Sequence, residues 1–108
     1  MWFEESNIYQ IYPLGMCGCP WQNPGEPADH DLTLVEGAGE PLPFTEHRID
    51  AVENYIEHIK GCGCDTVLFN PLFESDAHGY DTRNMRLLDR RLGTNEDLKR
   101  VCGRLREA

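Results

Sequence analysis

The feature that most constrains this chain is an alternation of strand-like and helix-like segments in which only two segments read as strands. Residues 8–12 are a short run of β-branched and aromatic side chains that Pro13 stops. Residues 66–69 are a nearly continuous apolar run closed by Asn70-Pro71, which is typical of a strand buried on both faces.

Helical periodicity follows each of these two runs. A first helix is predicted over residues 45–61, with Thr45 as its cap, Gly61 at its end and one apolar stripe formed by Ile49, Val52, Ile56 and Ile59. A second helix is predicted from a Thr94 cap onward, with Leu98, Val101, Cys102 and Leu105 on one face. Strands that alternate with helices predict an α/β fold with parallel pairing and right-handed crossovers.

The chain has 108 residues, enough for one domain and too few for two. Two strands bury two amphipathic helices poorly and leave open sheet edges. We therefore expect residues 1–108 to be one piece of a larger domain, and the isolated chain to self-associate.

Two segments are predicted as loops. Residues 14–44 are rich in Pro, Gly and acidic side chains, and a loop of that length is usually functional or mobile. Residues 74–82 are also loop by composition.

The net charge of −9 argues against nucleic acid as a partner, although eight of the ten Lys and Arg residues follow position 82. No apolar run approaches the ~20 residues of a membrane helix, so we expect no membrane partner. The N-terminus lacks the pattern of a signal peptide, and five cysteines are an odd number. These features predict a cytoplasmic protein with reduced thiols.

Cys17-Gly18-Cys19 and Cys62-Gly63-Cys64 could supply four thiolates to zinc or to an iron–sulfur cluster. A single residue between the thiols is unusual for such sites, so packing as small apolar residues is the favoured interpretation and a metal or redox pair is the alternative.

His78-Gly79-Tyr80-Asp81 follows the second predicted strand, at the strand end where α/β proteins place ligands. Tyr80 offers a flat face to a sugar or a base, and Asp81 offers acceptor oxygens to hydroxyl groups. An ordinary turn with a packed tyrosine explains these residues equally well.

Two stretches resemble the first and second strands of the α-amylase family of glycoside hydrolases. They are Ile8-Tyr9-Gln10-Ile11-Tyr12-Pro13 and residues 61–75, which read Gly-Cys-Gly-Cys-Asp-Thr-Val-Leu-Phe-Asn-Pro-Leu-Phe-Glu-Ser. Residues 78–82 and 92–98 are similar to that family's loop after strand two and its second helix. These motifs follow the family's order and separations, and the resemblance covers nearly all of the chain outside residues 20–44.

The resemblance implies a TIM (β/α)₈ barrel, of which this chain would be the first two βα units. It implies that the catalytic carboxylates follow later strands, so no catalytic residue is assigned. It also implies that Tyr80 stacks on the sugar at the cleavage site, that Asp81 bonds hydroxyls at the non-reducing end, and that His78 shapes the loop.

The chain departs from the family pattern at three places. Leu14-Gly15 replaces a common Asp-Arg-Phe, so calcium is possible by family but no metal ligand is assigned. Asn84-Met85 replaces a common Asp-Tyr pair and would alter the fit of substrate. Cys62 and Cys64 stand where aliphatic residues are usual.

The expected function is that of the N-terminal segment of a glycosidase that hydrolyses α-glucosidic bonds in maltooligosaccharides or starch-like glucans. The isolated chain is expected to be inactive. The alternatives are a non-catalytic carbohydrate-binding or assembly module, and a thiol-based metal or redox module.

Overall fold

The computed structural model describes residues 1–25 and 42–108. Its elements, in chain order, are the 3₁₀ helix η1 (Trp2–Glu5), β1 (Ile8–Ile11), α1 (Pro13–Met16), the 3₁₀ helix η4 (Arg48–Tyr55), α2 (Ile56–Gly61), β2 (Thr66–Phe69), β3 (Phe73–Ser75), β4 (Thr82–Leu88) and α3 (Asn95–Glu107). The central part of the predicted long loop, residues 26–41, lies outside the described residues, and α1 occupies its start.

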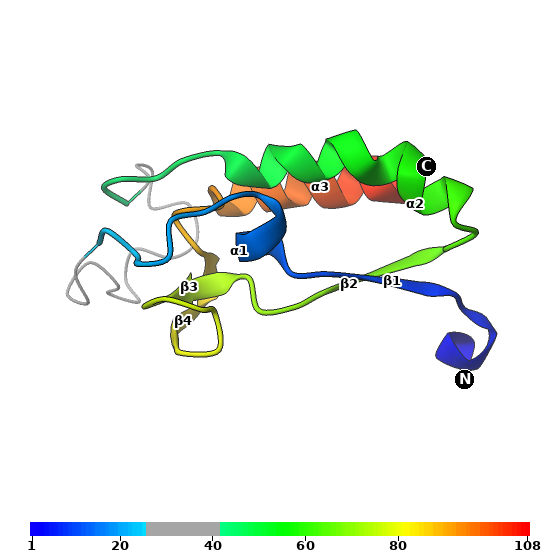
Figure 1. The fold of residues 1–108 in the computed structure, drawn as a ribbon, viewed down its shortest axis with the longest axis horizontal. Coiled ribbons are helices and arrows are strands. Elements are labelled where there is room, and N and C mark those ends of the chain that lie inside the picture. Colours follow the sequence, from blue (N-terminus) through cyan, green and yellow to red (C-terminus); the bar gives the residue numbers. More distant parts are fainter. Residues whose placement is uncertain (26–41) are drawn as a thin grey trace.

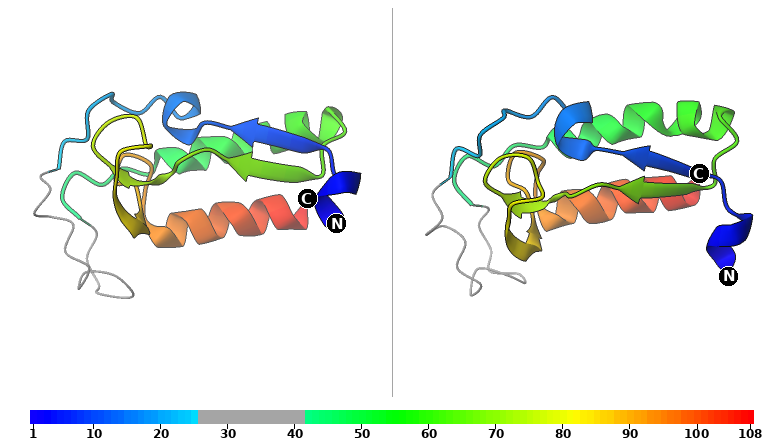
Figure 2. Two further views of the ribbon diagram at one scale, coloured as in Figure 1. Left: turned by 90° about the horizontal axis from the view of Figure 1, so that it is seen from below. Right: turned by 60° about the horizontal axis from the view of Figure 1, so that its bottom comes forward.

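The two predicted strands pair in parallel, as the alternation of strands and helices indicates. β1 lies beside β2 with Ile8 opposite Thr66 and Ile11 opposite Phe69. The helices η4, α2 and α3 lie together on one side of this sheet (Figures 1 and 2). This arrangement brings the carboxyl ends of both strands to the same end of the molecule.

The first predicted helix is present but differs in detail. Residues 48–55 are 3₁₀ helix and residues 56–61 continue as α-helix, so the end at Gly61 is confirmed. The predicted cap is wrong, because the helix begins after His47 and the Thr45 hydroxyl donates to the Leu42 carbonyl instead.

The second predicted helix begins at its predicted cap. The Thr94 hydroxyl accepts a hydrogen bond from the Asp97 N–H at 3.1 Å, and the Asp97 carboxylate accepts one from the Thr94 N–H at 2.9 Å. This reciprocal pair satisfies two N–H groups that the first helical turn would otherwise leave without partners.

The prediction of a plain loop over residues 74–82 is wrong. An antiparallel hairpin, β3–β4, contains part of this segment, with Phe73 opposite Leu88 and Ser75 opposite Thr82. The polar sequence of β4 has little strand propensity, and buried ion pairs described below hold its base together.

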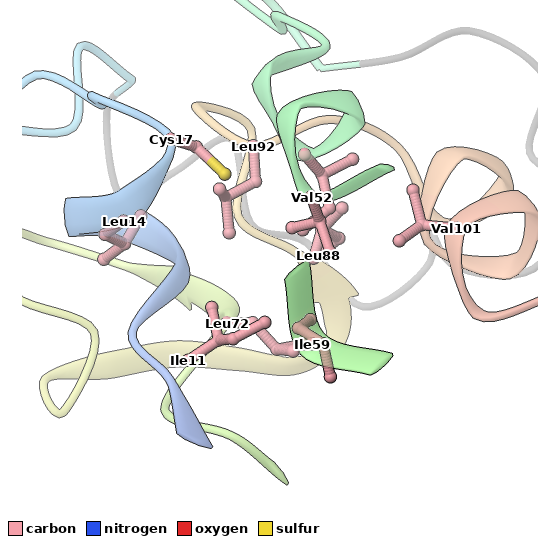
Figure 3. Close-up of a cluster of buried hydrophobic side chains, with 10 residues drawn as sticks. Ile11, Leu14, Cys17, Val52, Ile59, Leu72, Leu88, Leu92 and Val101 are labelled. Atoms are coloured by element: carbon pink, nitrogen blue, oxygen red, sulfur yellow. The ribbon is translucent and has the colours of Figure 1, made fainter. Parts of the chain in front are cut away.

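The core lies between the sheet and the helices (Figure 3). Its buried side chains come from β1, α1, η4, α2, β4, α3 and the connecting loops, and are Ile11, Leu14, Cys17, Ile49, Val52, Ile59, Leu72, Leu88, Leu92 and Val101. Ile49, Val52 and Ile59 of the first predicted stripe face this core, whereas Ile56 is only half-buried. Cys102 of the second predicted stripe is exposed.

The second strand is not buried on both faces as its sequence predicts. Leu68 is 51% exposed and Ile8 is 45% exposed, because the described helices cover only one face of the sheet. No helix among the described residues is long and apolar enough to cross a membrane.

Candidate functional site

The candidate site lies on the tip loop, residues 76–81, which joins β3 to β4 beyond the carboxyl end of β2. α1 follows β1 at this same end, and the phenol hydroxyl of Tyr12 donates to the His78 carbonyl at 2.6 Å. The hairpin is therefore fastened to the end of the first strand as well as following the second.

Tyr80 projects from a fixed turn. The residue is 67% exposed, yet its backbone N–H donates to Nδ1 of His78 at 3.1 Å. The His78 ring lies 6.1 Å from the Tyr80 ring, centroid to centroid, at a tilt of 38°. An exposed ring on a fixed backbone can stack on a flat apolar surface without the chain losing much further freedom.

Asp81 closes the same turn. Its carboxylate accepts hydrogen bonds from the N–H groups of Ala77 at 2.9 Å and Gly79 at 3.1 Å, and lies 3.6 Å from Nδ1 of His78. Desolvation alone would raise the pKa of Asp81, but these N–H donors and the nearby imidazole together lower it. The carboxylate thus holds the turn as an anion, and each of its oxygens keeps acceptor capacity for a further donor.

Gly79 lets the tip loop pack against the rest of the structure. Its φ of +98° is in the left-handed region. A Cβ at this position would lie 3.1 Å from both the Cβ and the carbonyl oxygen of Pro71 and 3.3 Å from Cδ1 of Leu14. The three predicted site residues, His78, Tyr80 and Asp81, are therefore brought together by one tightly packed turn.

The base of the hairpin holds a group of buried charges that the sequence analysis did not identify. We call Glu74, Asp89, Arg90 and Arg91 the charge cluster; each is at most 1% exposed. Nε of Arg90 lies 3.3 Å from Glu74, and Nε of Arg91 lies 2.9 Å from Asp89. Consecutive charges normally predict a solvated face, and the only signal of burial was the leucines that flank them.

Asp89 and Arg91 tie both strands of the hairpin together. The Asp89 carboxylate accepts from the N–H and the hydroxyl of Ser75 on β3, each at 3.1 Å. Arg91 donates to Asp89 through Nε and Nη2, both at 2.9 Å, and to the Ser75 hydroxyl at 3.1 Å. The buried ions are thus paired and hydrogen-bonded, which a charge inside a protein requires.

Glu74 and Arg90 connect the hairpin to residues 23–25. The amide of Asn23 donates to the Glu74 carboxylate and, at 2.8 Å, to the Ser75 carbonyl. Burial and the neighbouring Asp89 charge raise the pKa of Glu74, while Arg90 and Asn23 oppose that change. These contacts fix the hairpin base, and through it the position of the tip loop.

The two Cys-Gly-Cys segments do not form one site. Cys17 and Cys19 follow β1, whereas Cys62 and Cys64 precede β2, so the parallel strands place the pairs at opposite ends of the sheet. Burial raises the pKa of Cys17 to about 11 and that of Cys19 to about 12, which keeps both thiols protonated at neutral pH. The idea of four thiolates at one metal is therefore wrong for this fold.

The remaining His, Cys, Asp and Glu side chains in the described part of the chain also form no metal site. That part contains no group of three or more His, Cys, Asp or Glu side chains that could hold a metal ion. No calcium ligand is assigned among these residues.

The comparison with family models matches residues 48–108 to the alpha-amylase catalytic domain. The match begins at η4 and includes both the β3–β4 hairpin and α3. It covers more than half of the chain.

Curated relatives are similar over most of the chain. Cyclomaltodextrinase from Bacillus sp. is 28% identical over 103 residues, which are 93% of this chain and 18% of that protein. Oligo-1,6-glucosidase from Heyndrickxia coagulans is 28% identical over 102 residues, which are 93% of this chain and 14% of that protein. The chain thus spans less than a fifth of the length of these relatives.

Solved structures share the fold. Cyclic α-maltosyl-(1→6)-maltose hydrolase from Arthrobacter globiformis, in complex with maltose, superposes with a TM-score of 0.63 at 24% identity, covering 98% of this chain and 24% of that one. The isomaltulose synthase mutant D241A from Erwinia rhapontici NX5, in complex with D-glucose, gives a TM-score of 0.64 at 21% identity, covering 99% and 16%. These neighbours are TIM barrels of the α-amylase family, and the family-model match extends the likeness to sequence. The chain belongs to the α-amylase family of glycoside hydrolases.

Proposed function

We propose that residues 1–108 form the first two βα units of a (β/α)₈ barrel in a hydrolase of α-glucosidic bonds, acting on maltooligosaccharides or starch-like glucans. The parallel pair β1–β2 with its helices on one side supports this placement. In such a barrel, ligands bind at the carboxyl ends of the strands, which is where the tip loop lies.

The observation that carries the proposal is the exposed ring of Tyr80 on a hydrogen-bonded turn, in a chain of this family. We assign Tyr80 as a platform for a glucose ring, because the apolar face of a pyranose stacks on an aromatic ring. We assign the free acceptor capacity of Asp81 to sugar hydroxyls. His78 supports the turn through its bond from the Tyr80 N–H.

Catalysis is proposed to need carboxylates from later strands. A retaining glycosidase uses a nucleophile and an acid/base about 5 Å apart across the scissile bond. Glu74 and Asp89 are fully buried in ion pairs, and Asp81 is engaged in its own turn, so these carboxylates are poorly placed for such a pair. The isolated chain should release no reducing sugar from maltooligosaccharides, and clear turnover would contradict this assignment.

Tyr80→Ala tests the sugar platform. Titration of maltoheptaose into the ¹⁵N-labelled chain, followed by NMR, should show affinity lost in Tyr80→Ala and retained in Tyr80→Phe, which keeps the ring. Tyr55→Ala is a matched control, because Tyr55 is an exposed tyrosine on η4. Unchanged affinity in Tyr80→Ala would refute the platform.

A non-catalytic carbohydrate-binding or assembly module is the second candidate. The same exposed Tyr80 favours it, since a binding module needs the platform and no carboxylate pair. Glucan binding without turnover by the complete natural protein would favour this candidate over the hydrolase.

We also propose that the isolated chain self-associates and that the protein is cytoplasmic. Ile8 and Leu68 are exposed on the uncovered face of the sheet, and a groove of about 850 Å³ runs between α2, β2 and α3. All five cysteines are free, as a reducing compartment would leave them. Sedimentation of wild type and Leu68→Ser tests the association, which a wild-type monomer at all concentrations would refute.

A further inference from the structure

Apart from Trp2 of η1, two further large aromatic side chains are as exposed as Tyr80. Trp21 is 67% exposed and Phe44 is 66% exposed. Residues 20–25 and 42–46, which carry them, lie with the tip loop at the carboxyl end of β1 and β2 (Figures 1 and 2). Exposed apolar side chains that gather at one end of a molecule mark a surface that can bind a ligand, whereas single exposed ones need no explanation.

Arg91 of the charge cluster holds the backbone at Trp21. Its Nη1 donates to the carbonyl of Pro20 at 2.9 Å and to that of Trp21 at 3.0 Å. The same guanidinium donates to Asp89 and Ser75 at the base of the hairpin. One buried side chain therefore fixes the backbone of Trp21 relative to the hairpin that carries Tyr80.

Arg90 holds the backbone on both sides of Phe44. Its Nη1 donates to the carbonyl of Pro43 at 3.1 Å, and its own carbonyl accepts from the N–H of Glu46 at 2.8 Å. Phe44 has a φ of +64°, the one positive φ of a non-glycine residue in the described part of the chain. A bulky residue in this conformation is strained, and strained residues persist where the surroundings hold them.

We propose that Trp21 and Phe44 are additional platforms for glucose units of a longer α-glucan, outside the unit that Tyr80 receives. Arg90 and Arg91 are the positioning residues, since each bonds the backbone beside one platform and belongs to the cluster under the hairpin. A chain of glucose units presents repeated apolar ring faces, which several fixed aromatic rings at one end of the molecule can receive. This inference rests on the proposed function of Tyr80.

Ligands of different length distinguish the additional platforms from Tyr80, because only a longer glucan can reach them. Maltose and maltoheptaose are titrated into the 108-residue chain and followed by NMR, using wild type, Trp21→Ala, Phe44→Gly and Tyr80→Ala. Trp2→Ala is the matched control, because Trp2 is also 67% exposed but belongs to η1 near the opposite end. Arg91 holds residue 21 by its backbone carbonyl, which Trp21→Ala leaves in place.

Trp21→Ala and Phe44→Gly should each weaken maltoheptaose binding about tenfold, the effect of losing on the order of 50 Å² of apolar contact, and change maltose affinity less than twofold. Trp2→Ala should change neither. Wild-type maltoheptaose affinity in both platform variants overturns the inference, and a weakening by Tyr80→Ala in that same series leaves the proposed function standing. Absence of any binding by wild type overturns both.

Discussion

Removal of the Arg91 guanidinium should lower the free energy of unfolding of this chain by a large fraction. Arg91→Met keeps the volume and the apolar stem but deletes the donors to Asp89, Ser75, Pro20 and Trp21. Asp89 is 0% exposed and would remain as a buried carboxylate without its cation. The perturbation therefore exposes the energetic role of the charge cluster.

The expected loss of free energy of unfolding follows from the Asp89 carboxylate, which stays buried without its cation. Removing one member of a buried ion pair typically costs about 3–5 kcal/mol, because the other charge stays buried. A chain of this length has a total free energy of unfolding on the order of 5–15 kcal/mol, so the loss would be a large fraction of the whole. Asp89→Leu combined with Arg91→Met should cost less than the sum of the single variants by about 1–3 kcal/mol.

Urea denaturation followed by circular dichroism measures these values, at a concentration where sedimentation shows monomer. Arg86→Met is the control, since Arg86 is exposed on β4 and should change stability by less than about 0.5 kcal/mol. A cost below about 1 kcal/mol for Arg91→Met, or strict additivity of the double variant, would refute the reasoning.

The structure predicts the direction in which three further substitutions change stability. Gly79→Ala should destabilise the fold by about 1–3 kcal/mol in urea, because the new Cβ lies 3.1 Å from Pro71 at a φ of +98°; wild-type stability would count against the packed turn. Phe44→Gly should raise the thermal midpoint, with a gain of about 0.5–1 kcal/mol, by relieving a φ of +64°, and a lower midpoint would contradict the strain. Desolvation would raise the pKa of Asp97, but hydrogen bonds from Thr94 and His47 lower it overall. The contribution of Asp97 to folding stability is therefore fully present above its unfolded pKa of about 3.9. That contribution is lost as pH falls through the lower pKa of the folded state. Asp97→Asn should therefore flatten the fall in stability below about pH 4, and an unchanged slope would show that Asp97 does not carry it.

Periodic apolar positions predicted the parts of the fold that depend on a buried stripe. Ile49, Val52 and Ile59 face the core because their spacing keeps them on one side of the helix. The parallel pairing of β1 and β2 follows from the helix between them. The predicted helix start at Thr45 was wrong because a threonine hydroxyl can bond other nearby backbone groups. The Thr45 hydroxyl donates to the Leu42 carbonyl instead of capping the helix.

The hairpin was missed because its stability comes from long-range pairing of polar groups. β4 contains Arg83, Asn84 and Arg86, which give no strand pattern, and its base depends on Ser75 meeting Asp89. Position in the chain selected the tip loop as the candidate site, and its role in binding stays a prediction. Asp81 accepts hydrogen bonds from backbone N–H groups of its own turn. This role depends on backbone geometry, which the composition of the segment does not predict.

The central claim is that this chain begins a barrel whose chemistry is supplied by later strands. The measurement that tests it most directly is sequencing of the coding DNA past the Ala108 codon in the same frame. The account predicts an open frame that encodes further alternating strands and helices, with carboxylates at later strand ends. A natural stop codon directly after Ala108 would contradict the hydrolase assignment and leave glucan binding by Tyr80 as the function to examine.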